Sequence, residues 1–301
     1  MLHKVYSEKV VYSFSSSLQP VLEIESGDEV VFETRDARGG RAMRDSDQYI
    51  IPQSSPVGMG NPVTGPIAIK NADRGDSLVI EIEDIKIGCK GYVPTRQDLG
   101  VLREMVKNPG PRIINVRNGT ILFDEGIRLP TRPMIGTIGV APPSSSIPSM
   151  NSGSHGGNMD CNDIVVGSKV FLPVYTKGAL FALGDVHASM GDGEVTGGGL
   201  DIGSDVRVRI SLQKNLNFGG PLVETGSKIV IIHNDQSLEK AVRGVVEKSV
   251  SLIMEKKGLS FDDAYRFTSV FGDVKICACP NLADVVVRMH LPKIFNILNI
   301  E

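Results

Sequence analysis

The first two thirds of the chain alternate between short hydrophobic runs and strong chain breakers. The run EVVFET (29–34) has the β-branched and aromatic composition of a strand, and it ends in a polar, glycine-rich loop. In SLVIEIEDIKIG (77–88), Leu78, Ile80 and Ile82 occupy alternate positions, which predicts a strand with one drier face. This spacing of short runs predicts a β-rich body.

Three further runs extend this β pattern. DIVVGSKVFLPVY (163–175) and DVRVRISL (205–212) are strand-like, and Arg207 and Arg209 indicate one wet face in the second. KIVIIHN (228–234) has the continuous apolar character of a more buried strand. The region that follows Gly88, up to residue 139, is more irregular. The Pro/Gly/Ser-rich stretch at 139–158 is expected to be a long connection.

The pattern changes to helical from Ser237. Apolar residues recur at helical spacing after it, and Lys256 and Lys257 precede Gly258, which is typical of a helix C-terminus. Ser260 and Asp263 have the spacing of a capping box at the start of a second helix. Two strand-like runs, 273–280 and 284–292, follow. We therefore predict a mainly β fold, a β-sandwich or barrel-like body with an α+β C-terminal part.

The length of 301 residues is compatible with one large domain or two. We place a β-rich N-terminal domain at 1–150. The segment 151–301 then contains the catalytic loops and continues into the α+β part.

The charge, the apolar runs and the cysteine count indicate which partners and which cellular compartment to expect. A formal net charge of −3 gives no electrostatic reason to expect nucleic acid or an anionic membrane as a partner. The N-terminus lacks the apolar run of a secretory signal, and no run has the length of a membrane span. Four scattered cysteines do not form a disulfide pattern. We expect a cytoplasmic protein.

Candidate chemistry is concentrated in LGDVHASMGDGEVTGGGLD (183–201). Asp185 and His187 are two residues apart, as are Asp192 and Glu194, so each pair projects to one side of an extended backbone. Carboxylates with one imidazole suit zinc, manganese or iron, whereas all-oxygen subsets suit calcium or magnesium. Glu194 can instead move protons. A solvated acidic hairpin is the alternative interpretation.

A second polar loop, SHGGNMDCND (154–163), contains His155, Asn158 and Asp160 around Gly156 and Gly157. Backbone amides of a Gly-Gly pair can converge and stabilise an oxyanion. Turn chemistry, in which Asn and Asp bind nearby backbone groups, explains the same residues without a function.

Four other residues have titratable or nucleophilic side chains in less distinctive surroundings. Cys161 is a rival nucleophile with His155 nearby, although cysteine is more often a buried small hydrophobe. Asp36 lies where a strand breaks into a loop, a place where ligands are often displayed. His3 and His290 are expected to be incidental.

Taken together, ETRDARGG, GPIAIKNADRGDSLVIEI, SHGGNMDC and GSKVFLPVYTKGALFALGDVHASMGDGEVTGGGLD resemble the acetamidase/formamidase family, in order and separation. The resemblance implies a β-rich fold, hydrolysis of small aliphatic amides to ammonia and a carboxylate, bound zinc and/or calcium, and a homo-oligomer, a dimer or tetramer. One departure is Met190, where longer members have Gln before the GDGE motif.

Under this resemblance the polar loop positions acquire roles. Metal ligands are expected at Asp36, Asp160, Asp185, His187 and Asp192. Glu194 is expected to be the general base, with His155 and Asp160 also in the catalytic set. Asn158, Gly156 and Gly157 are expected to bind the substrate. A non-catalytic β-sandwich module that binds metal or carbohydrate is the alternative function.

Overall fold

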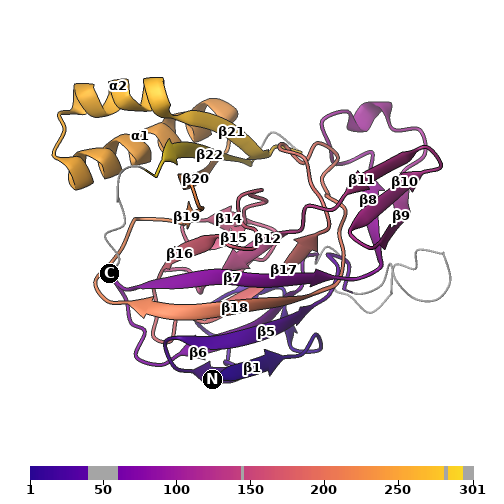
Figure 1. The fold of residues 1–301 in the computed structure, drawn as a ribbon, viewed down its shortest axis with the longest axis horizontal. Coiled ribbons are helices and arrows are strands. Elements are labelled where there is room, and N and C mark those ends of the chain that lie inside the picture. The colour runs from indigo at the N-terminus through magenta and orange to yellow at the C-terminus, as the bar shows by residue number, and fades with distance from the viewer. Residues whose placement is uncertain (40–59, 144–145, 281–283, 294–301) are drawn as a thin grey trace.

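The computed structural model of the protein describes residues 1–39, 60–143, 146–280 and 284–293 (Figure 1). A nine-stranded sheet runs through the molecule within these residues. Its strands, in spatial order, are β1 (Leu2–Val5), β5 (Asp28–Thr34), β18 (Ser204–Gln213), β7 (Ser77–Ile87), β16 (Lys169–Pro173), β19 (Leu222–Glu224), β20 (Lys228–Asp235), β22 (Val285–Pro292) and β21 (Asp273–Ala278).

A second sheet of seven strands faces the first. Its strands, in order, are β14 (Ser152–Gly153), β15 (Gly156–Asn158), β12 (Met134–Gly139), β17 (Phe181–His187), β6 (Val63–Ile69) and β2 (Val10–Val11), with β4 (Leu22–Ile24) also on β6. The register between β12 and β17 pairs Met134 with His187 and Thr137 with Gly184. This register brings the C-terminal end of β17 beside the start of β12.

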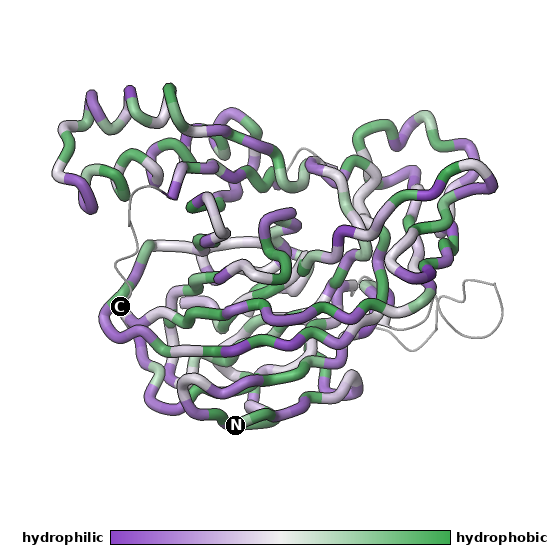
Figure 2. Tube along the Cα trace, viewed as in Figure 1, coloured by the Kyte–Doolittle hydropathy of each residue, from purple (hydrophilic) through white to green (hydrophobic). Residues whose placement is uncertain are grey.

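The main hydrophobic core lies between these two sheets. Phe32 and Ile80 from the nine-stranded sheet belong to the same buried cluster as Ile135 and Phe181 from the seven-stranded sheet. The rings of Phe32 and Phe181 meet edge to face, with centroids 5.7 Å apart. Hydrophobic and hydrophilic positions alternate along β7 and β18, as Figure 2 shows. The predicted mainly β sandwich is confirmed.

A four-stranded sheet occupies the stretch predicted to be irregular. It consists of β8 (Lys90–Thr95), β9 (Gly110–Arg117), β10 (Thr120–Asp124) and β11 (Ile127–Pro130), with the short 3-10 helix η1 (Arg103–Met105) between β8 and β9. The expectation of irregular structure was wrong. β11 is exposed along its length, and β9 buries only Ile114 and Val116, so the apolar signal of these two strands in the sequence is weak.

The segment at 139–158 also differs from its prediction as a single long connection. It contains β13 (Ile147–Pro148), which pairs with β3 (Ser13–Phe14), followed by β14 and β15. Both large sheets combine strands from before and after residue 150, so the boundary predicted at 150 does not correspond to a division of the sheets.

The α+β part at the C-terminal end is as predicted. Helix α1 (Leu238–Lys257) begins at Ser237, whose side chain accepts a hydrogen bond from the backbone N–H of Lys240. Helix α2 (Phe261–Phe271) begins at Ser260 in the same way. Both helices pack over β20, β21 and β22 through a second apolar cluster (Figure 1). Within the described residues, neither helix combines the length and apolar character of a membrane span.

Gly258 ends α1 in the left-handed conformation, with φ of 65°, and an added Cβ there would meet no atom within 4 Å. Gly258→Ala should therefore lower the free energy of unfolding by about 1 kcal/mol through backbone strain alone. Chemical denaturation measures this difference. Gly226→Ala, at an equally open position without positive φ, is the control and should change stability by less. Equal effects of the two variants would contradict this account.

Candidate active site

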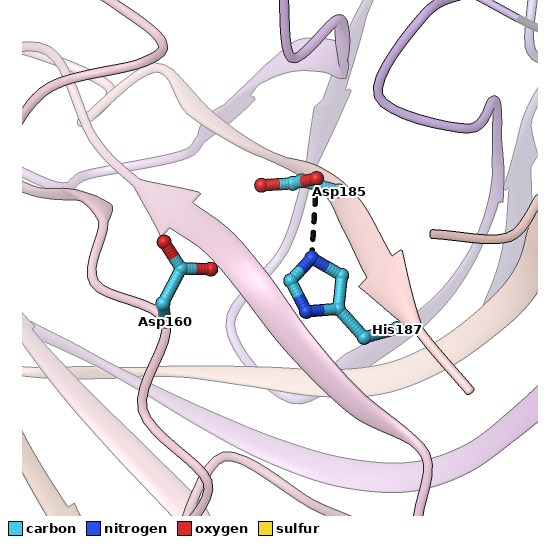
Figure 3. A group of neighbouring side chains, drawn as sticks. All are labelled: Asp160, Asp185 and His187. Atoms are coloured by element: carbon cyan, nitrogen blue, oxygen red, sulfur yellow. Dashed lines mark hydrogen bonds and ion pairs between the residues drawn. The ribbon is translucent and has the colours of Figure 1, made fainter. Parts of the chain in front are cut away.

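Asp160, Asp185 and His187 form a buried group at the end of β17. One potential ligand atom from each side chain lies within 4.8 Å of the others. Asp185 and His187 come from the same strand, and Asp160 faces them from the segment after β15 (Figure 3). The prediction that Asp185 and His187 converge is confirmed by a separation of 3.4 Å between Asp185 Oδ1 and His187 Nε2. The two acidic loops identified in the sequence therefore meet here.

Gly136 in β12 makes room for the two carboxylates. A Cβ at this position would lie 2.5 Å from Asp160 Oδ1 and 3.0 Å from Asp185 Oδ2. The backbone carbonyl of Gly136 also accepts a hydrogen bond from the Asp160 N–H at 3.1 Å. The absence of a side chain at Gly136 thus lets both acids approach the same point over the strand.

Asp201 and Tyr92 complete one side of the group. Asp201 pairs with His187 in an isolated β-bridge, and its Oδ1 lies 3.4 Å from His187 Nε2. The buried Tyr92 bridges to Asp201 through its backbone as well. The imidazole lies flat against Gly199, where an added Cβ would be 2.4 Å from Nδ1. His187 Nε2 is consequently directed between two carboxylates.

Two polar side chains hold the second oxygen of Asp185. Asn61 Nδ2 donates to Asp185 Oδ2 at 2.7 Å, and Thr137 Oγ1 donates to it at 3.1 Å. Both donors also bind Asn158 Oδ1, at 2.9 and 2.6 Å. Asp185 is therefore oriented through Oδ2, and its Oδ1 remains directed toward His187.

Several residues of the site adopt the left-handed backbone conformation. The φ angles are 45° at Asp160, 54° at Asp185, 45° at Glu194 and 51° at Asn61. Residues with a Cβ are uncommon in this region, and such positions persist where the surrounding structure holds them. The conformation at Asp185, within a strand, breaks the regular ladder at the point where its carboxylate meets that of Asp160.

Burial raises the pKa of three site carboxyls, those of Asp160, Asp201 and Glu194. It raises the pKa of Asp160 to about 7, with a further contribution from the Asp185 carboxylate. It raises the pKa of Asp201 to about 8, against the effect of His187. The pKa of Glu194 is raised well above its usual range by burial and then by the neighbouring Asp160. Glu194 thus lies beside Asp160, at the edge of the group.

For the His187 imidazole, burial and the neighbouring carboxylates have opposite effects on the pKa. Burial alone would lower the pKa of His187, but the carboxylates of Asp185, Asp201 and Asp160 raise it well above its usual range. Four carboxyl groups surround this one imidazole. A buried set of acids with so little positive charge near it is costly unless it takes up protons or a cation.

The residues fit a divalent cation. Within the described part of the chain, neither carboxylate oxygen of Asp160 has a hydrogen-bond partner, although both are buried. His187 Nε2 lies 3.4 Å from Asp185 Oδ1 and from Asp201 Oδ1. Donors at about 2.0–2.1 Å from a tetrahedral zinc ion lie about 3.3 Å from one another, so these spacings are those of ligands around one ion.

Asp192 does not join this group. Its side chain is 40% exposed and accepts hydrogen bonds from Arg288 Nη2 at 2.8 and 2.9 Å. The expectation that Asp192 and Glu194 project to one side was wrong, because 190–197 is a turn rather than an extended strand and the two acids contact different partners.

His290, expected to be incidental, is buried and binds Asp163 Oδ2 at 2.7 Å.

His155 lies in the turn between β14 and β15, and Gly156 and Gly157 lie in β15, outside the Asp160 group. The His155 ring is fully buried, packs edge to face on Phe14 and approaches Gly153 and Gly157. Gly156 and Gly157 are enclosed in β15, between β12 and β14. At Gly157, where φ is 84°, an added Cβ would lie 2.2 Å from the carbonyl oxygen of Asn151. Close packing against neighbouring backbone therefore explains why glycine occupies these two positions.

Asp36 is buried just after β5, where its Oδ1 accepts a hydrogen bond from the Arg38 N–H at 2.8 Å. Its charge raises the pKa of both Tyr92 and Asp201, after the effect of burial, so it lies on the Asp201 side of the site.

Cys161, the residue after Asp160, is fully buried. Burial and then the neighbouring Cys277 raise the pKa of its thiol well above the usual range, which opposes the thiolate that a nucleophile needs.

Sequence reasoning missed several residues of the site. Asp201 ends the glycine-rich run that drew attention to the region, and Gly136, Thr137, Tyr92 and Asn61 come from segments without a chemical signature. Each joins the site through strand pairing or a long-range hydrogen bond, which a single sequence does not display.

The model of the acetamidase/formamidase family matches this chain in two overlapping segments, residues 6–153 and 144–269. The chain belongs to the acetamidase/formamidase family. A protein described as a predicted acetamidase/formamidase from Thermoanaerobacter tengcongensis superposes with a TM-score of 0.92 at 33% identity, over 97% of this chain and 96% of that chain. An acetamidase from Bacillus halodurans gives the same TM-score at 32% identity, over 99% and 100%.

More distant relatives are consistent with this membership. A Schizosaccharomyces pombe protein named as a formamidase is 24% identical over 252 residues, 64% of this chain and 61% of that protein. The Methylophilus methylotrophus formamidase is 39% identical over 62 residues, 20% of this chain and 15% of that protein. The matches thus span less than two thirds of these curated relatives. A gamma lactamase from Delftia acidovorans shares the fold, with a TM-score of 0.64 at 20% identity over 95% of this chain and 89% of that chain.

His155 generates a prediction about acid stability. Burial lowers its pKa from 6.5 to about 4, so the unfolded chain binds a proton that the folded chain does not as the pH falls below 6.5. Stability is therefore lost on acidification through the window from 6.5 to 4. Between pH 7.5 and 5.0, the native protein should lose about 2 kcal/mol more unfolding free energy than His155→Gln.

Denaturant titrations of both proteins at the two pH values measure this difference. The site carboxyls titrate in both proteins, so their contribution cancels in the comparison. Equal losses would show that His155 is protonated in the folded state or does not contribute to the acid response.

Proposed function

We propose that this protein hydrolyses small aliphatic amides of the formamide and acetamide type to ammonia and a carboxylate, with a divalent metal ion held by Asp160, Asp185 and His187. One observation carries the proposal: in a chain of the acetamidase/formamidase family, several buried carboxyl groups converge on one imidazole, and the Asp160 oxygens have no partner among the described residues. Family membership supports the reaction class, and the buried acids support the cation.

The donor set favours zinc over calcium. Two carboxylates and one imidazole are typical zinc ligands, whereas calcium takes six to eight oxygens. A divalent cation here supplies Lewis acidity, which polarises a carbonyl group and makes water a stronger acid near neutral pH. Asp201 bridges to the His187 backbone and contacts its ring, and Asn61 and Thr137 orient Asp185, as supporting groups around metal ligands do.

Glu194 moves the proton in this proposal. Its side chain is half-buried beside Asp160 and is not needed to hold the cation. In its ionised form it accepts the proton of the attacking water, and it then donates that proton to the departing nitrogen, because an amide nitrogen leaves poorly unless it is protonated. In this proposal Asn158 orients the substrate through Nδ2, and the two donors that bind its Oδ1, Asn61 and Thr137, support this role by fixing the amide group.

Metal removal tests the proposed cofactor. The purified protein should contain zinc by mass spectrometry, and it should release ammonia from formamide or acetamide. Dialysis against a chelator should abolish that activity, and zinc should restore it. Full activity in the metal-free protein would overturn the role of the metal. Bound metal without ammonia release from any amide in a panel would favour a non-catalytic binding module.

Glu194→Gln tests the proton transfer. The variant should retain its metal content but lose turnover by about 100-fold or more, because general acid–base catalysis contributes roughly 10²–10⁴-fold. Glu247→Gln, on the exposed face of α1, where Glu247 pairs with Arg243, is the control and should leave kcat unchanged. Normal turnover in Glu194→Gln would assign the proton transfer to another group.

A further inference from the structure

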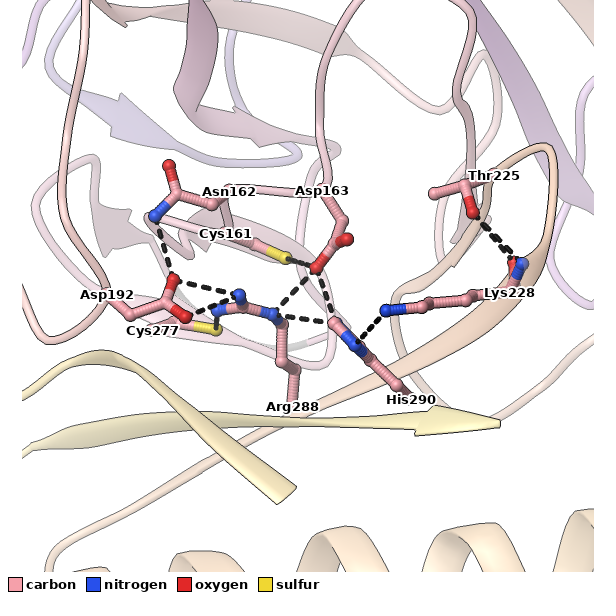
Figure 4. A network of polar contacts seen from close by, with 9 residues as sticks. All are labelled: Cys161, Asn162, Asp163, Asp192, Thr225, Lys228, Cys277, Arg288 and His290. Carbon is pink, nitrogen blue, oxygen red and sulfur yellow. Dashed lines mark hydrogen bonds and ion pairs between the residues drawn. The ribbon is translucent and has the colours of Figure 1, made fainter. Parts of the chain in front are cut away.

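Arg288 on β22 is a buried guanidinium, 3% exposed, that contacts two acids from different loops. Its Nη2 donates to both carboxylate oxygens of Asp192, at 2.8 and 2.9 Å, and its Nε lies 2.7 Å from Asp163 Oδ2 (Figure 4). Buried ion pairs of this kind are held tightly, because loss of one member leaves the other charge unpaired in a poorly solvated site.

The two acids are close in sequence to residues of the proposed active site. Asp163 follows Asp160 by three residues, and Asp192 precedes Glu194 by two. Arg288 therefore connects the segment that carries a proposed metal ligand with the segment that carries the proposed general base. Neither segment contains a long regular element that would hold it in place.

Other contacts reinforce this connection. Asn162 Nδ2 donates to Asp192 Oδ1 at 2.8 Å, which joins the two segments directly. Lys228 Nζ donates to His290 Nδ1 at 3.2 Å, and His290 Nε2 in turn lies 2.7 Å from Asp163 Oδ2 (Figure 4). His290 Nε2 also lies 3.0 Å from Arg288 Nε, so Asp163 is in contact with both Arg288 and His290.

The backbone of the Glu194 loop is also bound to β21. The Gly193 N–H donates to the carbonyl of Cys277 at 2.9 Å, and the Cys279 N–H donates to the carbonyl of Gly193 at 3.0 Å. These two bonds fix one point of the loop. Arg288 fixes a second point, one residue earlier, through the side chain of Asp192.

We propose that Arg288 is a positioning residue that sets the separation and orientation of Asp160 and Glu194 by binding Asp163 and Asp192 at once. This inference rests on the proposed function. Asp160 and Glu194 both have φ of 45°, a conformation that requires support from surrounding structure. A displacement of about 1 Å in a proton-transferring group can reduce turnover by about 100-fold, so a clamp on these loops acts on catalysis without contacting the substrate.

Asp192→Asn tests the clamp at its most exposed member, where the change leaves the core packing intact. We expect kcat to fall at least 10-fold while KM stays within about threefold and metal content is unchanged. Hydrogen–deuterium exchange of residues 190–197 should become faster. Asp124→Asn, which removes an exposed ion pair with Arg112 between β9 and β10, is the control and should change none of these quantities.

Arg288→Lys provides a second, independent variant, because lysine keeps the charge but cannot span both acids. It should reproduce the loss of kcat and the faster exchange of Asp192→Asn. Combining Arg288→Lys with Asp192→Asn should add little further loss, since both changes break the same connection. Additive losses would instead indicate two separate roles and overturn the single clamp.

Unchanged kcat and unchanged exchange in Asp192→Asn would also overturn the proposal. Failure of the proposed function is distinguished from failure of the clamp by the native protein. If it releases no ammonia from any amide tested, amide hydrolysis is wrong, and the exchange rates of 190–197 in the two variants still decide whether Arg288 holds this loop.

Discussion

Burial of several carboxyl groups around a single imidazole is the constraint on which the rest of this structure depends. Asp160, Asp185 and Asp201 are almost fully buried around His187, and Glu194 is half-buried next to Asp160. Like charges held this closely in a poorly solvated site repel one another, and burial together with the Asp185 carboxylate raises the pKa of Asp160 and Asp201. The cluster is stable only with protons or a cation within it, and this requirement makes it a natural site for a metal ion.

The two facing sheets provide the rigidity that such a cluster needs. β17 contributes Asp185 and His187, and β12 contributes the glycine over which two carboxylates meet. Asp160 and Asp201 arrive from segments that pair with these strands or bridge to them. The large apolar core between the sheets contains none of the acidic or imidazole side chains of the site. Its packing can therefore hold the left-handed backbone of the site in place.

The C-terminal α+β part also contacts the loops of this site, through the side chain of Arg288. Its strands extend the nine-stranded sheet, and the helices cover them with a separate apolar cluster. From this layer Arg288 extends to the loops of Asp160 and Glu194. The β-rich body and the C-terminal part are therefore connected by charge as well as by strand pairing.

The sequence by itself determined the elements with strong local signals. The alternation of Leu78, Ile80 and Ile82 marked β7, and Ser237 and Gly258 marked the ends of α1, because burial on one face and capping depend on neighbours in the chain. The pair Asp185 and His187 was predictable for the same reason, since two residues at that spacing share one face of a strand. The strands β8 to β11 were missed, and of these β11 is exposed along its length and β9 buries only two of its residues.

Only the tertiary structure decided how the acids are divided between roles. Asp192 and Glu194 are two residues apart, yet one binds Arg288 from the far end of the chain and the other lies beside Asp160. Asp201, Tyr92 and Gly136 entered the site through pairings that join distant segments. Local spacing fixes which way a side chain points along one strand. Which partner it meets there depends on the pairing register and packing of segments far apart in sequence, which no single stretch of the chain contains.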